Sequence, residues 1–272
     1  MIIDLLKTEY LKFKKNSTVT ILLAFYFIFL PFSIFLGSEL KDSIPTFISN
    51  KNAFFVFPST WDYMGYAGSW LVFFFLGVAI IYMTCNEIAY KTLRQGIING
   101  YTRIDFFVAK LSTLVLLALA ATLYYAIITS ILGYVNTEDL TMALYLENIS
   151  AVARYFLMCM GYFSLALLFA FVLRKSGLAI FLYLSYVIII EPIIRGGYTY
   201  SIGNKYVNYF PMNATEDLMP LPLWRFAEAL PQGKQDLDFE FLLSYPTATT
   251  LTLIYSIIFL GLAYLSFMKK DI

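Results

Sequence analysis

Residues 111–134 read LSTLVLLALAATLYYAIITSILGY, an uninterrupted run without one charged side chain. A helix needs about 20 mostly apolar residues to cross the hydrocarbon core of a bilayer. This run is long enough to do so. It therefore predicts a transmembrane helix, and the rest of the chain repeats the pattern.

Five further stretches meet the same criterion, at residues 16–37, 67–85, 155–173, 176–194 and 245–268. The composition agrees, with 60% hydrophobic and 14% charged residues, against about 45–50% and 25% in soluble domains. The run at 16–37 is longer than the apolar core of a signal peptide, so we expect it to be retained. The sequence predicts an all-α polytopic membrane protein in which residues 1–272 form a single transmembrane domain of six helices.

Residues that are common in catalytic and zinc-binding sites are missing or isolated in this chain. It contains no histidine, and its two cysteines, Cys85 and Cys159, lie far apart inside apolar runs. Histidine is the commonest zinc ligand and the base in Ser–His catalysis, and the two cysteines form no metal-binding pattern. We therefore expect no catalytic residues, no metal site, no cofactor held by this chain and no nucleic-acid partner.

The distribution of charge predicts the orientation of the six helices. With the N-terminus inside, the inner segments hold 12 basic and 5 acidic residues, a net charge of +7. The remaining 7 basic and 13 acidic residues give the other side a net charge of −6. Because cytoplasmic loops carry an excess of Lys and Arg, both termini should be cytoplasmic.

The loops differ greatly in length. A short link at residues 174–176 predicts that the fourth and fifth helices are antiparallel neighbours. The segment 195–244 is predicted to be a long extracytoplasmic loop with short helices. In this loop, Asn213 and Glu216 have the spacing of a helix N-cap and its third residue. After Pro222, apolar residues recur with helical spacing through Leu230.

The N-terminal segment 1–15 places Ile3, Leu6, Tyr10 and Phe13 on one face of a helix. Such a pattern is typical of a helix that lies in the membrane interface with its lysines near anionic headgroups. The alternative is an ordinary basic flank that only sets the topology.

The stretch 87–110, between the second and third helices, predicts an elbow. Good helix formers continue beyond Glu87 as far as Gln95, and Gly96 and Gly100 then allow a turn. Thr102 and Asp105 match a capping pattern directly before an apolar run, so the third helix should begin near residue 103. A rigid cationic arm of this kind can dock a partner, although a solvated basic loop would have the same charge.

Glu191 and Pro192 interrupt the fifth helix. An ionisable residue within a span marks a functional site by default, and a proline removes a backbone donor and bends a helix. Two interpretations are open. Glu191 lies at the outer interface, paired with Arg195 or hydrated, and Pro192 forms a structural or gating kink. Alternatively, Glu191 contacts a substrate.

The elbow resembles the segment after the second helix in permeases of exporter-type (type 2) ABC transporters. The resemblance is carried by Glu87-x4-Thr92-Leu93-Arg94-Gln95 and by Gly100-x2-Arg103-x6-Lys110. Those permeases also begin with an interfacial helix that carries a Glu-x-x-Lys element, and Glu9-Tyr-Leu-Lys12 stands in that place. The residues that the resemblance assigns to coupling with an ATPase are Glu87, Lys91, Thr92, Arg94, Arg103 and Lys110.

The resemblance implies a permease subunit of an ATP-driven exporter in a bacterial cytoplasmic membrane. It would pair with a second permease subunit, as a homodimer or heterodimer, and with separate ABC ATPase subunits that hold ATP and Mg²⁺. The chain has no G-x-x-x-x-G-K-[ST] loop to cradle phosphates, so it is not expected to be an enzyme. The alternatives are an ion-coupled carrier or channel, and a non-transporting envelope scaffold driven by an ABC ATPase.

The predicted topology can be tested by labelling. Cysteines introduced at Lys41 or Lys234 should react with an impermeant thiol reagent applied outside the cell. Cysteines at Lys91 or Arg174 should not react, because these positions lie inside. The reverse pattern of labelling would contradict the placement of both ends in the cytoplasm.

Overall fold

A computed structural model of the chain describes residues 16–39, 54–98, 100–203, 206–222 and 242–269. Within these ranges the chain forms helices and turns, without a strand. Six helices are long and apolar enough to cross a membrane, which confirms the predicted fold class.

The first span is α2 (Ser17–Glu39), and the second joins α3 (Ser59–Leu71), the π-helical segment η2 (Val72–Gly77) and α4 (Val78–Ala89). The third is α6 (Arg103–Asn136) and the fourth is α8 (Ser150–Leu173). The fifth joins α9 (Ser176–Ser185), the π-helical segment η3 (Tyr186–Ile190) and α10 (Glu191–Ile202), and the sixth is α13 (Tyr245–Lys269). Between the spans, the described residues form four short helices: α5 (Thr92–Ile98), α7 (Met142–Leu146), η4 (Val207–Tyr209) and α11 (Pro211–Glu216).

Several spans extend beyond their predicted ends. The second begins at Ser59 rather than residue 67, the fourth at Ser150 rather than 155, and the fifth continues to Ile202 rather than 194. Hydropathy shows only where the side chains of a helix stop being apolar. The helix itself continues until its backbone hydrogen bonds end. The predicted short link between the fourth and fifth spans is confirmed, since Arg174 ends α8 in the left-handed conformation (φ 57°) and α9 begins at Ser176.

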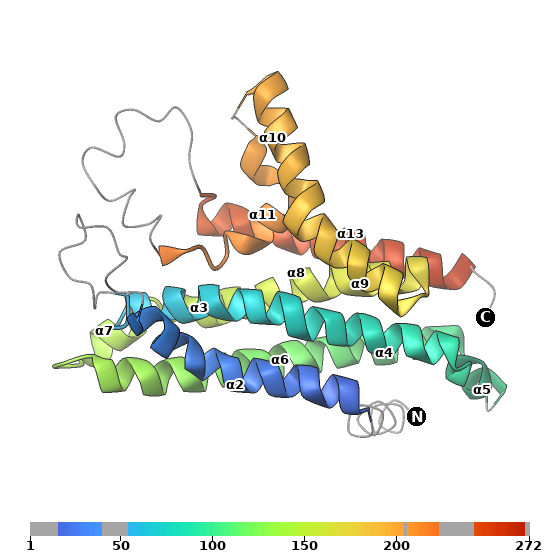
Figure 1. The fold of residues 1–272 in the computed structure, drawn as a ribbon, viewed down its shortest axis with the longest axis horizontal. Helices are drawn as coiled ribbons and strands as arrows, with labels where there is room; N and C mark the ends of the chain where they lie inside the picture. Colours follow the sequence, from blue (N-terminus) through green and yellow to red (C-terminus); the bar gives the residue numbers. More distant parts are fainter. Residues whose placement is uncertain (1–15, 40–53, 99, 204–205, 223–241, 270–272) are drawn as a thin grey trace.

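The spans run side by side between two ends of the molecule (Figure 1). One end, called the elbow end here, holds α5, the start of α2 and the end of α13. The other, called the far end, holds α7 and the end of α6, and α11 lies further in, toward the middle of the bundle. The second and fourth spans are mostly buried, whereas only about a third or less of the apolar window is buried in each of the other four. The core therefore lies where α8 packs against the second span, with α6, α9 and α13 around it.

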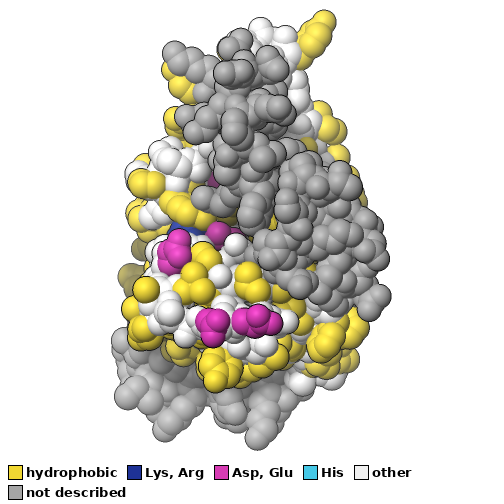
Figure 2. Space-filling view, turned by 90° about the vertical axis from the view of Figure 1, so that its left-hand side faces the viewer, with side chains coloured by type: hydrophobic (Ala, Val, Ile, Leu, Met, Phe, Trp, Pro, Cys, Tyr) yellow, Lys and Arg dark blue, Asp and Glu magenta, His cyan; other side chains and the backbone are white. Residues whose placement is uncertain are grey.

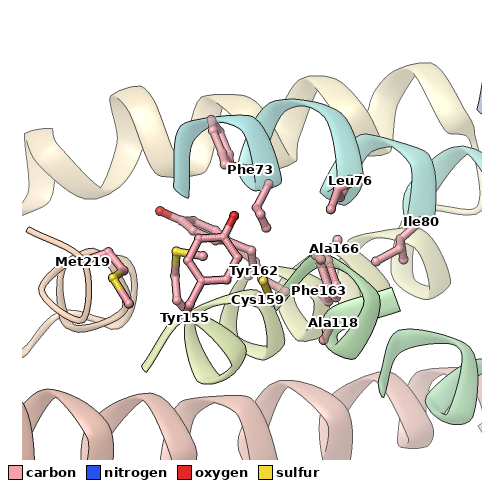
Figure 3. Close-up of a cluster of buried hydrophobic side chains, with 14 of the residues drawn as sticks. Phe73, Leu76, Ile80, Ala118, Tyr155, Cys159, Tyr162, Phe163, Ala166 and Met219 are labelled. Carbon is pink, nitrogen blue, oxygen red and sulfur yellow. The ribbon is translucent and has the colours of Figure 1, made fainter. Parts of the chain in front are cut away.

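Small residues let the spans approach α8 closely. A Cβ atom added at Gly161 of α8 would lie 2.8 Å from Thr215 of α11 and 3.1 Å from Thr252 of α13. Small residues at such interfaces allow backbones to come together and gain van der Waals contact. In the core cluster, Phe73 and Leu76 of the second span point toward Tyr162 and Ala166 of α8 (Figure 3).

Tyrosine hydroxyls link four spans inside the core. The hydroxyl of Tyr26 donates to the carbonyl of Ala121 at 3.0 Å and lies 3.0 Å from the hydroxyl of Tyr155. The ring of Tyr155 stacks on Tyr125 at 4.1 Å between centroids, and the hydroxyl of Tyr125 donates to the carbonyl of Trp61 at 2.6 Å. Each of these hydroxyls thus has a partner in a region without water. Together, the hydrogen bonds and the ring contact join the first four spans.

A buried ion pair joins the segments of the far end. Arg154 donates to Asp62 at 3.3 Å, to the Asn148 side chain at 2.8 Å and to the carbonyl of Leu218 at 3.1 Å. Its guanidinium carbon lies 3.4 Å from the ring centroid of Tyr245, whose hydroxyl donates to the same oxygen of Asp62 at 3.2 Å. One side chain of α8 therefore holds α3, the turn after α7, the turn after α11 and the start of α13.

The two ends differ in charge. At the far end Glu138, Asp139 and Glu147 are exposed, and acidic side chains are visible on that face in Figure 2. At the elbow end Lys91, Arg94 and Lys175 are exposed. This is the asymmetry that the predicted orientation requires, while the side on which each end lies stays a prediction.

Substitution of Arg154 should destabilise the far end. Arg154→Met leaves the buried carboxylate of Asp62 without its charge partner, and breaking a buried pair costs roughly 3–5 kcal/mol. Thermal unfolding of the purified chain should therefore shift to clearly lower temperature, whereas Arg94→Met, at an exposed position, should leave it within the small range of surface substitutions. The double variant Asp62→Asn/Arg154→Met should lose less than the sum of its two single variants. Equal effects of Arg154→Met and Arg94→Met would refute the role of this ion pair.

Candidate functional site at the elbow

The elbow between the second and third spans is built from two turns and the short helix α5. The helix α4 ends at Ala89, and Lys91 adopts the left-handed conformation (φ 56°) that separates it from α5. The prediction that the second helix continues through Gln95 is therefore wrong. Good helix formers are indeed helical at these positions, but in a separate element with its own direction.

The second turn of the elbow follows α5. Gly100 has a φ of 94°, which glycine adopts without steric cost, so the turn predicted there is confirmed. The turn predicted at Gly96 is wrong, because this residue lies within α5. A Cβ at Gly96 would collide with the ring of Phe106, so the glycine lets α5 pack against the start of α6.

The third span begins where its capping pattern predicts. Thr102 is the N-cap of α6 and accepts a hydrogen bond from the backbone N–H of Asp105 at 3.2 Å. The carboxylate of Asp105 accepts one in return from the backbone N–H of Thr102 at 2.8 Å. This reciprocal box satisfies two amides that the first turn would otherwise leave without a partner.

A buried ion pair anchors the elbow to the bundle. The ammonium of Lys110 on α6 contacts the carboxylate of Glu87 on α4, and both residues are buried. The hydroxyl of Thr92 donates to the carbonyl of Glu87 at 3.1 Å, which ties the start of α5 to the end of α4. Arg103 donates to the carbonyl of Met268 at 2.9 Å and so connects the start of α6 to α13.

The six predicted coupling residues thus separate into two groups. Glu87, Arg103 and Lys110 make contacts within the chain that fix the ends of α4 and α6. Lys91, Thr92 and Arg94 lie on the exposed part of the elbow. Two large apolar side chains, Tyr90 and Ile98, are 75% and 77% exposed beside them. The elbow therefore offers a small surface that is both cationic and apolar, on a support held by buried charges.

Glu9 and Lys12 of the predicted interfacial helix, with the rest of segment 1–15, lie outside the described residues. Their role stays a prediction.

Glu191 does not lie at a hydrated interface, so that part of the prediction is wrong, although the charge of Arg195, one helical turn further on, does act on its carboxylate. It is 2% exposed, and its carboxylate accepts hydrogen bonds from the backbone N–H groups of Met212 and Asn213, each at 2.8 Å. These amides belong to the first turn of α11, so Glu191, which lies in the fifth span, caps this short helix. Asn213 lies inside α11 and is not its N-cap, which corrects the second prediction for this segment.

The helix continues across Pro192. The π-helical segment η3 ends at Ile190, two residues before the proline, and a π turn can accommodate the backbone N–H that proline lacks. Beyond this point α10 diverges from the bundle (Figure 1). A gating role for Glu191 and Pro192 stays a prediction. The predicted amphipathic stretch after Pro222 falls in residues 223–241, outside the described part.

Comparison with curated proteins gives no match. Comparison with protein families gives one whose description is ABC-2 family transporter protein, and it matches residues 5–190, more than half of the chain. The match covers the N-terminal segment, the first four spans, the elbow and α9 with η3. With six spans and this match, the chain belongs to the ABC-2 family of transporter proteins.

Proposed function

We propose that this ABC transporter permease subunit works in an exporter and couples to a separate ATPase through the elbow. The observation that carries the proposal is the construction of α5. It is a short helix that exposes Arg94 and Ile98 at one end of the bundle, with Lys91 exposed directly before it, while Glu87 and Lys110 anchor its base. A rigid, anchored helix transmits displacement to the spans on either side, whereas a loosely attached loop would absorb it.

The proposed partners follow from the family. ATP and Mg²⁺ would be held by two ABC ATPase subunits, and a second permease subunit would complete the translocation pathway. In a bacterial cytoplasmic membrane, the elbow end would face the cytoplasm together with both termini. The charge asymmetry between the two ends supports this orientation.

The buried charges support this reading over an ion-coupled carrier. Such carriers place ionisable groups along the path of the ion. In the described spans, the buried carboxylates of Asp62, Glu87 and Glu191 form hydrogen bonds or ion pairs with other residues of this chain. These contacts join segments of the chain to one another and leave no ion in the role of partner. A non-transporting scaffold driven by the same ATPase would need the same elbow. Only transport measurements distinguish a scaffold from an exporter.

Reversal of charge on α5 should disrupt coupling. Arg94→Glu places a carboxylate at the proposed contact, where wrong-sign charge costs several kcal/mol. The tagged variant should lose its ATPase partner when purified from native membranes, or retain it without stimulating hydrolysis. Glu138→Lys, an equal change of charge on the exposed far end, should leave both properties as in the wild type. Normal binding and normal stimulation with Arg94→Glu would show that the elbow is only a linker.

The anchor of the elbow should matter as much as its surface. Lys110→Met leaves Glu87 buried without the ammonium, at a cost of roughly 3–5 kcal/mol. The variant should unfold at lower temperature and stimulate the ATPase less. The double variant Glu87→Gln/Lys110→Met carries no unpaired charge and should recover most of the stability. A single variant as stable and as active as the wild type would contradict this account.

A further inference from the structure

A cavity of about 540 Å³ lies at the far end, between the second span and the diverging helix α10. The second span contributes Tyr66 and Trp70 to its wall, α8 contributes Tyr162, and the turn after α11 contributes Met219. Cavities of this size and aromatic character are typical of sites for small organic molecules. The cavity is separate from the elbow and is not needed for the coupling proposed above.

Glu216, the last residue of α11, supplies a carboxylate to this wall. Among the residues that the structure describes, no group donates a hydrogen bond to this carboxylate. Its burial, with the charges of Glu191 and Asp217 nearby, raises the pKa of Glu216 to about 7, although the charge of Arg195 acts in the opposite direction. A half-buried carboxylate without a donor is stabilised by any cation that enters beside it.

The neighbouring charged groups are already engaged. Arg195 donates to the carbonyl of Val207 at 3.2 Å and to Asn208 at 3.4 Å. Glu191 caps α11, as described above. Asp217 accepts hydrogen bonds from the Asn213 side chain and from the backbone N–H of Leu243, both at 3.0 Å. Among the lining residues that the structure describes, Glu216 is therefore the carboxylate that remains available to a ligand.

We propose that this cavity binds the ammonium group of an amphipathic organic cation, with Glu216 as the counter-ion. The rings of Tyr66, Trp70 and Tyr162 would receive the apolar body, and an ammonium beside aromatic rings gains cation–π attraction. The proposal names a class of cargo and in that sense rests on the proposed exporter function. The ammonium can come from a soluble amine or from the headgroup of phosphatidylethanolamine.

The test uses the purified full chain in an uncharged maltoside detergent, without an ATPase. The probes are dansylcadaverine, which carries a primary ammonium, and dansyl-6-aminohexanoate, which carries a carboxylate on a similar tether. Dansyl emission reports transfer into an apolar site. At pH 8 we expect the ammonium probe to bind at least ten-fold more tightly than the carboxylate probe.

Two variants locate the site. Glu216→Gln removes the charge while keeping the shape, and should abolish the preference for the ammonium probe. Trp70→Leu keeps an apolar side chain without the indole ring, and should weaken binding several-fold. Glu138→Gln, at an exposed carboxylate outside the cavity, should bind as the wild type does. Thermal unfolding of each variant checks that it is folded.

The dependence on pH has a definite sign. Binding requires ionised Glu216, and the primary ammonium of the probe stays protonated between pH 6 and pH 8. Affinity should therefore fall about ten-fold between pH 8 and pH 6, as Glu216 becomes protonated. The Glu216→Gln variant should lack this dependence.

Lipid competition identifies the source of the ammonium. Displacement of dansylcadaverine by phosphatidylethanolamine but not by phosphatidylglycerol would assign the site to a lipid headgroup. Displacement by neither would assign it to soluble amines. Equal binding of both probes, or equal affinity in wild type and Glu216→Gln, would overturn the proposal. Because no ATPase is present, failure here leaves the coupling hypothesis untouched, and failure of the elbow test leaves this site standing.

Discussion

The interior of a bilayer supplies no water, so each polar group between the spans must find its partner within the protein. The architecture of this chain follows from that constraint. Tyrosine hydroxyls in the core meet carbonyls or each other, as Tyr26 does with Ala121 and Tyr155. Towards the ends, where whole charges are buried, opposite charges meet, as in Glu87–Lys110 and Asp62–Arg154. Hydrophobic runs make these segments helices, and the polar contacts link particular helices to one another.

These contacts also divide the molecule by function. At the elbow end the buried pair fixes the base of α5, so the exposed surface of α5 is presented on a firm support. At the far end Arg154 holds the turns that carry α11, and α11 in turn places Glu216 in the cavity wall. The fourth span carries Arg154 and packs along the second span. The second span ends close to Glu87 of the elbow. The second and fourth spans are thus the physical connection between the two ends.

The sequence predicted the six spans because their apolar runs are long and uncharged. It also predicted the start of the third span, since the capping pair Thr102 and Asp105 acts locally and needs nothing from the rest of the chain. It did not predict the role of Arg154, which lies directly before an apolar run and there resembles an ordinary loop charge. Glu191 was misplaced for a related reason. Its partners are amides 21 and 22 residues further along the chain, and no local pattern points to them. The break at Lys91 was missed because the residues on both sides favour a helix, so only the packing of α5 reveals it.

The central position of α8 has a consequence for how this protein can vary. Its Gly161 and Ala166 allow close packing, and protein surrounds most of its length. Substitutions there must satisfy several neighbours at once. The first, fifth and sixth spans instead expose broad apolar faces, with Ile28, Phe181 and Ile257 all more than 60% exposed. Where such faces meet lipid, any apolar side chain of suitable length suffices. Adaptation to bilayers of different thickness or lipid composition can therefore proceed on these outer helices, while the helix at the centre stays unchanged.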